Sequence, residues 1–166
     1  MLKRCSWVNE NNPAYIKYHD EEWGKVIDDD NKLFEVLSLE IFQTGLSWEI
    51  VLNKRDALKK SFNDFIPDIL ITYNNDKISS LIQDKSIIRH KLKINSIINN
   101  AKVFLVIKKE FGSFRDYVYM FDDENELLKD LKARGMSFIG KSTIKSFMEA
   151  IGIINSHDLE CFKHNL

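Results

Sequence analysis

LFEVLSLEIFQTGLSW, residues 33–48, is the stretch of sequence that decides the fold. Five of its positions recur at helical spacing and would share one face of a helix: Leu33, Val36, Leu37, Glu40 and Thr44. Four of them suit a buried or half-buried face, and the exception is Glu40. Gly45 can end this helix, and Ser47 can cap a second helix that begins at Trp48. The stretch therefore predicts a tight helix–turn–helix corner.

Glu40 is the residue in this corner that demands an explanation. Burying a lone charge is costly, so a carboxylate on an apolar face has to be paired, protonated or placed to bind a ligand. The amide of Gln43 lies one turn further along the same helix. Two interpretations stay open: an ion pair with a Lys or Arg elsewhere in the chain, or an acid that faces a ligand.

The composition predicts one globular domain, residues 1–166, of the all-α class. The chain is 44% hydrophobic, which suffices for a core, and it shows no strand–helix alternation and no internal repeat. No apolar run reaches about 18 residues, and the N-terminus lacks an apolar signal core. We therefore expect no membrane span and a cytoplasmic location, where the two cysteines would stay reduced. A monomer is the default.

Periodicity and end signals predict further helices along the chain. The clearest is 91–110, which has a continuous apolar face, with Gly112 as its end and Ser113 as the cap of the next helix. Asn12 and Pro13 predict a helix start. The other expected helices cover residues 48–62, 67–71, 77–83, 114–121, 125–134 and 142–151.

Large rings concentrate in residues 1–24, which hold few aliphatic side chains. Tyr15 and Tyr18 are three residues apart and share a helical face, and Trp7 and Trp23 flank them. Such a segment can be a lid packed on the core, or it can wall a pocket for a flat ligand. The density of rings with a polar tip favours the pocket.

Cysteine and histidine gather near the two ends of the chain. Cys5 and His19 lie near the start, and His157 and Cys161 form a His-x-x-x-Cys pattern that would share one face of a helix. Two thiolates and two imidazoles make a closed tetrahedral zinc site of the structural kind, which would join the two ends. His164 competes with His157, and ordinary core thiols with surface histidines are the alternative.

Charge is segregated although the net charge is only −1. Residues 85–109 contain seven Lys or Arg and no Asp or Glu, which suggests one positively charged face. Residues 77–109 form a helix–connector–helix pattern, and a tight hairpin before a helix N-terminus can present N–H groups to a phosphate. A solvated basic helix that binds nothing is the alternative.

Short motifs along nearly the whole chain resemble one family, DNA-3-methyladenine glycosylase I, a divergent group of helix–hairpin–helix glycosylases in bacterial base excision repair. The motifs are RCSWV at 4–8, YIKYHD at 15–20, EWG at 22–24, LE at 39–40, GLSW at 45–48, LIQD at 81–84, IIRH at 87–90, RG at 134–135, FIG at 138–140, SFM at 146–148 and NSH at 155–157, followed by Cys161.

The resemblance implies a role for each matching residue. One structural Zn²⁺ would be bound by Cys5, His19, His157 and Cys161. The flipped base would be contacted by the catalytic Glu40 and by the rings of Tyr15, Tyr18, Trp48, Trp7 and Trp23. The DNA backbone would be gripped by the hairpin residues Ile87, Ile88, Arg89, His90 and Lys91.

The resemblance also implies the reaction: flipping and excision of 3-methyladenine from double-stranded alkylated DNA by hydrolysis of the N-glycosidic bond. Alkylation at N3 makes the base cationic, which electron-rich rings and a carboxylate such as Glu40 favour. No lysine of the hairpin is placed as a Schiff-base nucleophile, so we expect a monofunctional hydrolase that does not cleave the strand and that releases free 3-methyladenine.

Some residues depart from the family pattern. The chain is shorter between Phe121 and Lys132, and Ile41 and Phe42 replace smaller residues beside Glu40, which could reshape the pocket. Two rivals follow: a zinc-stabilised helical DNA-binding module without catalysis, and a glycosylase for a different lesion.

Overall fold

The computed structural model describes residues 1–166, and all of its regular structure is helical, which confirms the all-α prediction. None of the helices combines the length and the apolar composition that a membrane crossing needs. In chain order the elements are α1 (Pro13–Lys17), the π-helical turn η1 (Tyr18–Glu22), α2 (Asp30–Gln43), α3 (Trp48–Asn53), α4 (Arg55–Ser61), the 3₁₀ turn η2 (Asn63–Phe65), α5 (Pro67–Leu70), α6 (Asn75–Gln83), α7 (Lys91–Phe111), α8 (Phe114–Val118), α9 (Glu124–Ala133) and α10 (Lys141–Ala150).

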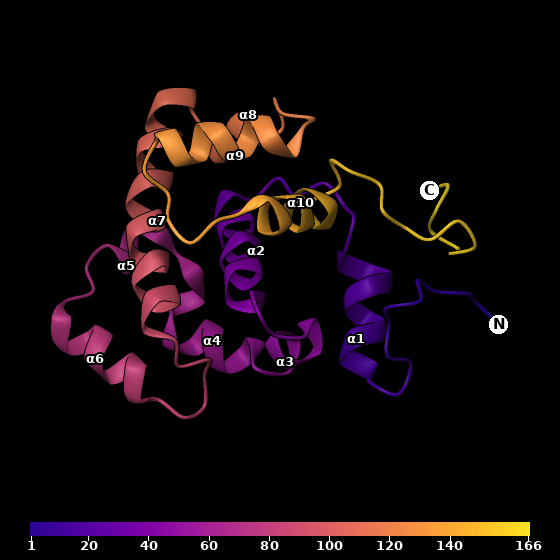
Figure 1. Ribbon diagram of the computed structural model, residues 1–166, viewed down its shortest axis with the longest axis horizontal. Helices are drawn as coiled ribbons and strands as arrows, with labels where there is room; N and C mark the ends of the chain where they lie inside the picture. The colour runs from indigo at the N-terminus through magenta and orange to yellow at the C-terminus, as the bar shows by residue number, and fades with distance from the viewer.

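Helix α2 lies in the middle of the molecule, with α7 on one side and α10 across it (Figure 1). All ten residues 33–42 are buried, so the helix is covered on every side and not along one stripe. Asp29 caps its start by accepting a hydrogen bond from the Lys32 N–H. Thr44 is exposed, contrary to the helical spacing, because the chain leaves the helix after Gln43.

The expected helix 48–62 is wrong as a single element, because the chain bends at Lys54 into α3 and α4. The bend lets Val51 and Leu58 reach one core from two directions. It also places Arg55 at the start of α4, against acids of other elements. The expected helix 114–121 is shorter than predicted and ends at Val118.

Glu35 is a buried carboxylate that the sequence pattern did not single out. Its oxygens lie 2.7 Å from Arg55 Nη2, 2.8 Å from Lys32 Nζ and 3.2 Å from Lys59 Nζ. Arg55 also donates two hydrogen bonds to Glu22 of η1. Burial would raise the pKa of Glu35, but the Arg55 charge and the hydrogen bonds lower it to about 2. This cluster fastens the N-terminal segment to α2 and α4.

Lys93, in the first turn of α7, holds the C-terminal end of α2. Its buried ammonium donates to the backbone oxygens of Phe42 at 2.8 Å and Thr44 at 2.6 Å. These carbonyls have no partner within α2, and a cation near a helix C-terminus also favours the helix dipole. The contact ties the α2–α3 turn to the start of α7.

The two ends of the chain lie together, on the side of the molecule away from α6 (Figure 1). The Phe162 N–H donates to Lys3 O at 2.8 Å, and the Ser6 N–H donates to Asp158 at 2.6 Å. Residues 157–161 form a turn, in which the Cys161 N–H donates to Asp158 O, so His157 and Cys161 do not share one face of a helix. The N-terminal and C-terminal segments are therefore held together by contacts between loops.

Candidate active site and metal centre

A cavity of about 230 Å³ opens beside the α2–α3 corner. Its walls come from four parts of the chain: the N-terminal segment, α2, the first residue of α3, and α10. The lining residues are Trp7, Tyr15, Tyr18, Trp23, Glu40, Gln43, Trp48, Ser146 and Glu149. All six residues that the sequence analysis assigned to a base pocket therefore line one cavity.

Glu40 reaches the cavity from α2 with a carboxyl that is only 5% exposed. No Lys or Arg pairs with it, so the ion-pair interpretation is wrong for this residue. Burial, together with the nearby charge of Glu149, raises the pKa of Glu40 to about 8. The cavity thus holds an acid that is neutral at pH 7 and that a cation entering the cavity would ionise.

The rings form the walls of the cavity and touch one another. The centroids of Tyr18 and Trp48 are 5.0 Å apart, and those of Trp7 and Trp23 are 4.8 Å apart in an edge-to-face arrangement. Tyr15 adds a third contact, at 5.6 Å from Trp7. The buried indole N–H of Trp48 has no hydrogen-bond partner in the protein. The cavity is therefore narrow, aromatic and able to hold a flat group.

Three lining residues were absent from the predicted site: Gln43, Ser146 and Glu149. Gln43 stands one turn after Glu40, and its amide donates to Leu46 O at 3.2 Å, within the corner. Ser146 and Glu149 are three residues apart, which puts them on one face of α10. Ser146 belongs to the SFM motif at 146–148, but no local pattern marks Glu149, because only the tertiary fold brings α10 against α2.

Ile41 and Phe42, the bulky departures beside Glu40, do not line the cavity. Both side chains are fully buried in the core, and the Phe42 ring packs against Phe62 at 5.6 Å. A helix turns by about 100° per residue, so neighbours of Glu40 point to other sides of α2. The expectation that these two residues reshape the pocket is not supported.

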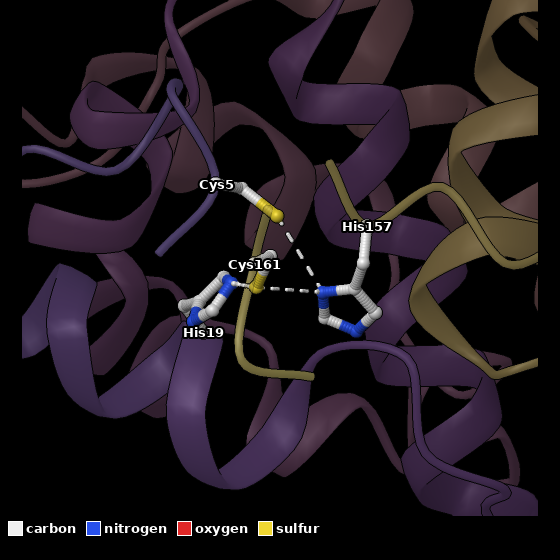
Figure 2. A group of neighbouring side chains, drawn as sticks. All are labelled: Cys5, His19, His157 and Cys161. Atoms are coloured by element: carbon white, nitrogen blue, oxygen red, sulfur yellow. Dashed lines mark hydrogen bonds between the residues drawn. The ribbon is translucent and has the colours of Figure 1, made fainter. Parts of the chain in front are cut away.

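Cys5, His19, His157 and Cys161 converge at the meeting point of the chain ends (Figure 2). Their ligand atoms all lie within 4.8 Å of one another. The Nδ1 atom of His157 is 3.5 Å from Cys5 Sγ and 3.6 Å from Cys161 Sγ, and Cys161 Sγ is 3.5 Å from His19 Nε2. His164 is not a member, because its Nδ1 lies 2.9 Å from His157 O.

The geometry of this cluster fits a tetrahedral metal ion. Zinc bonds of about 2.3 Å to sulfur and about 2.0–2.1 Å to nitrogen place S and N about 3.6 Å apart at the tetrahedral angle. The three S···N separations agree with that value. Around the cluster, His19 Nδ1 lies 2.8 Å from Asp20, which leaves Nε2 free for a metal, and the Asp158 N–H donates to Cys5 Sγ. The residues present therefore could hold a metal.

The metal cluster and the cavity share walls. The Trp23 ring meets His157 edge-to-face at 4.6 Å, and Trp7 meets His19 at 5.3 Å. Gly24 follows Trp23 with φ of +81°, and a Cβ there would come within 3.0 Å of His157 Nε2. Glycine is needed at this position for both reasons. The cluster consequently supports the rings that wall the cavity.

The hairpin between α6 and α7 divides its predicted residues into two kinds. Ile87 is buried in the core and Ile88 is half-buried, whereas Arg89, His90 and Lys91 are exposed. The His90 imidazole also caps α7 by accepting a hydrogen bond from the Lys93 N–H at 3.2 Å. Ile87 thus anchors the hairpin, and only the exposed residues are free to contact a ligand.

Comparisons with known sequences agree along the whole chain. The profile of a family described as methyladenine glycosylase matches residues 7–130 and 121–164. DNA-3-methyladenine glycosylase 1 of Escherichia coli is 37% identical over 180 aligned residues, covering 96% of both chains. The DNA-3-methyladenine glycosylase of Haemophilus influenzae is 35% identical and covers 97% of both.

Solved structures show the same likeness. A crystal structure of a 3-methyladenine DNA glycosylase I superposes with a TM-score of 0.93 at 38% identity, over 98% of this chain and all of that one. A Staphylococcus aureus structure, solved for the recognition of 3-methyladenine, has a TM-score of 0.90 at 30% identity, over 96% of this chain and 95% of that one. The all-helical fold is common to all three.

Proposed function

This chain belongs to the methyladenine glycosylase family, and we propose that it excises 3-methyladenine from alkylated DNA as the first step of base excision repair. The observation that carries the proposal is the cavity in which the buried, unpaired Glu40 faces aromatic rings. A related Staphylococcus aureus enzyme was solved for its recognition of 3-methyladenine. The chain is accordingly an enzyme that hydrolyses N-glycosyl bonds.

The target base has to leave the duplex before it can enter the cavity, because its reacting atoms are inaccessible in the stack. Trp48 and Tyr18 form one wall on which a flipped purine can stack, and Trp7, Tyr15 and Trp23 close the remainder. Stacking accepts any purine, so the choice of lesion requires a further feature.

The positive charge of the alkylated base is the feature that distinguishes the lesion from a normal purine. Alkylation at N3 gives the base a positive charge, which the faces of electron-rich rings stabilise. Glu40 can accept a hydrogen bond from the base edge, and its ionised form adds an attraction that neutral adenine does not receive. The cation in turn favours loss of the Glu40 proton.

The proposed reaction requires no covalent bond between the protein and the DNA. When the bond between the sugar C1′ and the base nitrogen breaks, its electron pair stays with the base and neutralises the positive charge. A water molecule attacks C1′ and loses a proton to solvent. Glu40 acts by charge and hydrogen bonding, and the strand stays intact because no lysine forms a Schiff base with the sugar.

The same proposal assigns the metal and the DNA contacts. One structural Zn²⁺ would be held by Cys5, His19, His157 and Cys161, where it fixes the chain ends and takes no part in the chemistry.

We propose a single domain over residues 1–166 with a helix–hairpin–helix unit at about 77–109. In that unit the exposed Arg89, His90 and Lys91 and the hairpin backbone would grip double-stranded DNA. A cytoplasmic monomer completes the proposal.

Base release from methylated duplex DNA, resolved by chromatography, tests the function. The wild-type protein should release free 3-methyladenine, and Glu40→Gln should release it at least about tenfold more slowly, since a charge-assisted contact contributes about 1.4 kcal/mol or more. Equal release by both proteins would move the catalytic role to the rings and bound water. Release by neither, with DNA binding retained, would favour the non-catalytic DNA-binding module.

A further inference from the structure

A second carboxylate, Glu149, lines the same cavity as the predicted site residues. It projects from α10, on the face that also presents Ser146. Glu149 is half-buried, whereas Glu40 is almost fully buried.

Glu149 also lines a neighbouring polar hollow of about 400 Å³, and the groups that can carry a positive charge in this hollow are Lys25, Lys163 and His157. No Lys or Arg lies within ion-pair distance of its carboxylate, although nine other acidic side chains of the protein take part in ion pairs: Glu10, Asp20, Glu22, Asp28, Glu35, Glu110, Asp116, Asp130 and Glu160. An unpaired acid at the junction of two hollows is available to a cationic ligand.

We propose that Glu149 is a second charge-recognising residue of the base pocket: with Glu40, it selects a purine that carries a fixed positive charge over a neutral purine. This inference rests on the proposed function, since it concerns how the same pocket distinguishes alkylated from normal bases. Glu149 determines specificity, and the breaking of the glycosidic bond stays with the chemistry described above.

The two carboxylates act on each other. Burial first, and then the negative charge of Glu149, raise the pKa of Glu40 to about 8. At pH 7 the carboxyl of Glu40 therefore keeps most of its proton. A cationic purine that binds has to displace the Glu40 proton before both acids can attract it, whereas a neutral purine gains nothing from that step.

Other ionisable groups near Glu40 do not supply a competing charge. Tyr18 keeps its proton, because burial and the charge of Glu40 raise its pKa. On α7, the Lys93 ammonium is bound to the backbone at the end of α2. No charged side chain of the other elements packed against α2, namely α3, α8 and η2, lines the cavity. The remaining ionisable group of the cavity is Tyr15.

Binding of two small probes as a function of pH tests the inference. The 3,9-dimethyladeninium ion carries a fixed positive charge, and 9-methyladenine is its neutral counterpart; both can be followed by tryptophan fluorescence. For wild type, a Glu40 pKa of about 8 predicts that the Kd for the cation tightens about tenfold between pH 7 and pH 9. The Kd for 9-methyladenine should change less than about twofold.

Glu149→Gln should bind the cation several-fold more weakly than wild type at pH 9, because one of two negative charges is gone. Its affinity should also vary less between pH 7 and pH 9 than that of wild type, because the pKa of Glu40 falls once its neighbour is neutral, although burial still raises it. Glu40→Gln should lose the same pH dependence and keep a residual preference for the cation that Glu149 provides. A merely structural role of Glu149 would move neither quantity.

Glu124→Gln is the matched control. It removes the same charge from a half-buried position on α9 that lies outside the cavity, and it should behave as wild type. Identical cation binding by Glu149→Gln and wild type at both pH values would overturn the inference. Base release from methylated DNA is measured in parallel. If wild type releases no 3-methyladenine, the proposed function fails, while the charge preference of the pocket can still be read from the probes.

Discussion

The protonation state of Glu40 is the residue-level property on which recognition depends. Its carboxyl has no hydrogen-bond donor in the protein, and the nearest charge acting on it is also negative. Both facts disfavour the carboxylate in the free protein. Ionising Glu40 in the free protein therefore lowers the stability of the folded state. A cationic ligand in the cavity would offset this loss, because its charge stabilises the carboxylate.

This loss gives a prediction for stability. The pKa of Glu40 is about 8 in the folded protein, above its unfolded value of 4.5, so the folded protein holds the proton more tightly. The stabilisation is fully present below pH 4.5 and is lost as the pH rises through about 8. Relative to wild type, Glu40→Gln should gain up to about 5 kcal/mol in free energy of unfolding between pH 4.5 and pH 9. Urea denaturation at a series of pH values measures it.

Glu124→Gln is again the suitable control, because it lies outside the cavity. Its stability should follow that of wild type across the same pH range. If Glu40→Gln and wild type differed by a constant amount from pH 4.5 to pH 9, Glu40 would titrate normally and the charge argument for the pocket would be wrong.

At the level of elements, the Glu35 cluster decides where the N-terminal segment lies. Arg55 bridges Glu22 of η1 and Glu35 of α2, and it can do so only because the chain bends at Lys54. The side chain of Glu35 is 3% exposed, so it depends on its cationic partners. Tyr18, at the start of η1, is positioned by the same contacts.

Arg55→Met should therefore destabilise the protein by about 3 kcal/mol at pH 7, because it leaves a buried carboxylate short of a partner. The pKa of Glu35 is lowered to about 2, so its stabilisation is present above pH 4.5 and is lost as the pH falls towards 2. The difference between variant and wild type should shrink over that range. Chemical denaturation at pH 3 and pH 7 is the measurement.

An exposed ion pair provides the comparison for Arg55. Arg115 pairs with Asp28, which is largely exposed, so Arg115→Met should change the free energy of unfolding by about 1 kcal/mol or less. A loss for Arg55→Met no greater than that of Arg115→Met would show that the buried cluster does not hold the N-terminal segment.

The hairpin before α7 carries the third prediction. Arg89 and Lys91 are exposed, and neither forms an ion pair within the protein. Replacing both with Ala should weaken duplex binding and lower the slope of log affinity against log salt by about 2, because two phosphate contacts are lost. Binding of free 3-methyladenine should not change. The same pair of replacements at Lys129 and Lys132 on α9, both exposed, is the control; an equal loss there would mean that the hairpin has no special role.

For the whole molecule, the features that could be predicted are those with local causes. Pro13 begins α1, Ser47 caps α3, and Gly112 follows the last residue of α7, as their residue types indicate. The break at Lys54 could not be predicted, because it is stabilised by acids 20 and 33 residues away from Arg55.

The residues of the candidate site also divide into those that could be predicted from the sequence and those that could not. Its rings and Glu40 belong to motifs of the sequence, whereas Glu149 belongs to none and is brought to the cavity only by the packing of α10 on α2. His157 and Cys161 meet through a turn and not along one face of a helix, because a His-x-x-x-Cys spacing can bring both side chains to one ion from either conformation. The site residues within local motifs could thus be predicted from the sequence, whereas those that long-range packing brings to the cavity could not.

The cluster of Cys5, His19, His157 and Cys161, which could hold a metal ion, lies where the ends of the chain meet the pocket, and it gives the last prediction. Removing the ion with a chelator, or changing Cys161→Ser, should lower Tm by about 10 °C, as expected for a loss of about 3–4 kcal/mol in a chain of this size. Since Trp7 and Trp23 contact its histidines, binding of 3-methyladenine should be lost as well.

His164→Ala is the control for the cluster, because the one hydrogen bond of the His164 imidazole is to the His157 backbone oxygen. This variant should keep one bound ion per chain in metal analysis. Metal content, Tm and base binding should all decrease for Cys161→Ser, and all three should stay at the wild-type level for His164→Ala. If the ion could be removed while Tm and base binding stayed unchanged, the packing of Phe162 on Lys3 and the other loop contacts would suffice to join the two ends. The walls of the pocket would then be set by the aromatic contacts themselves.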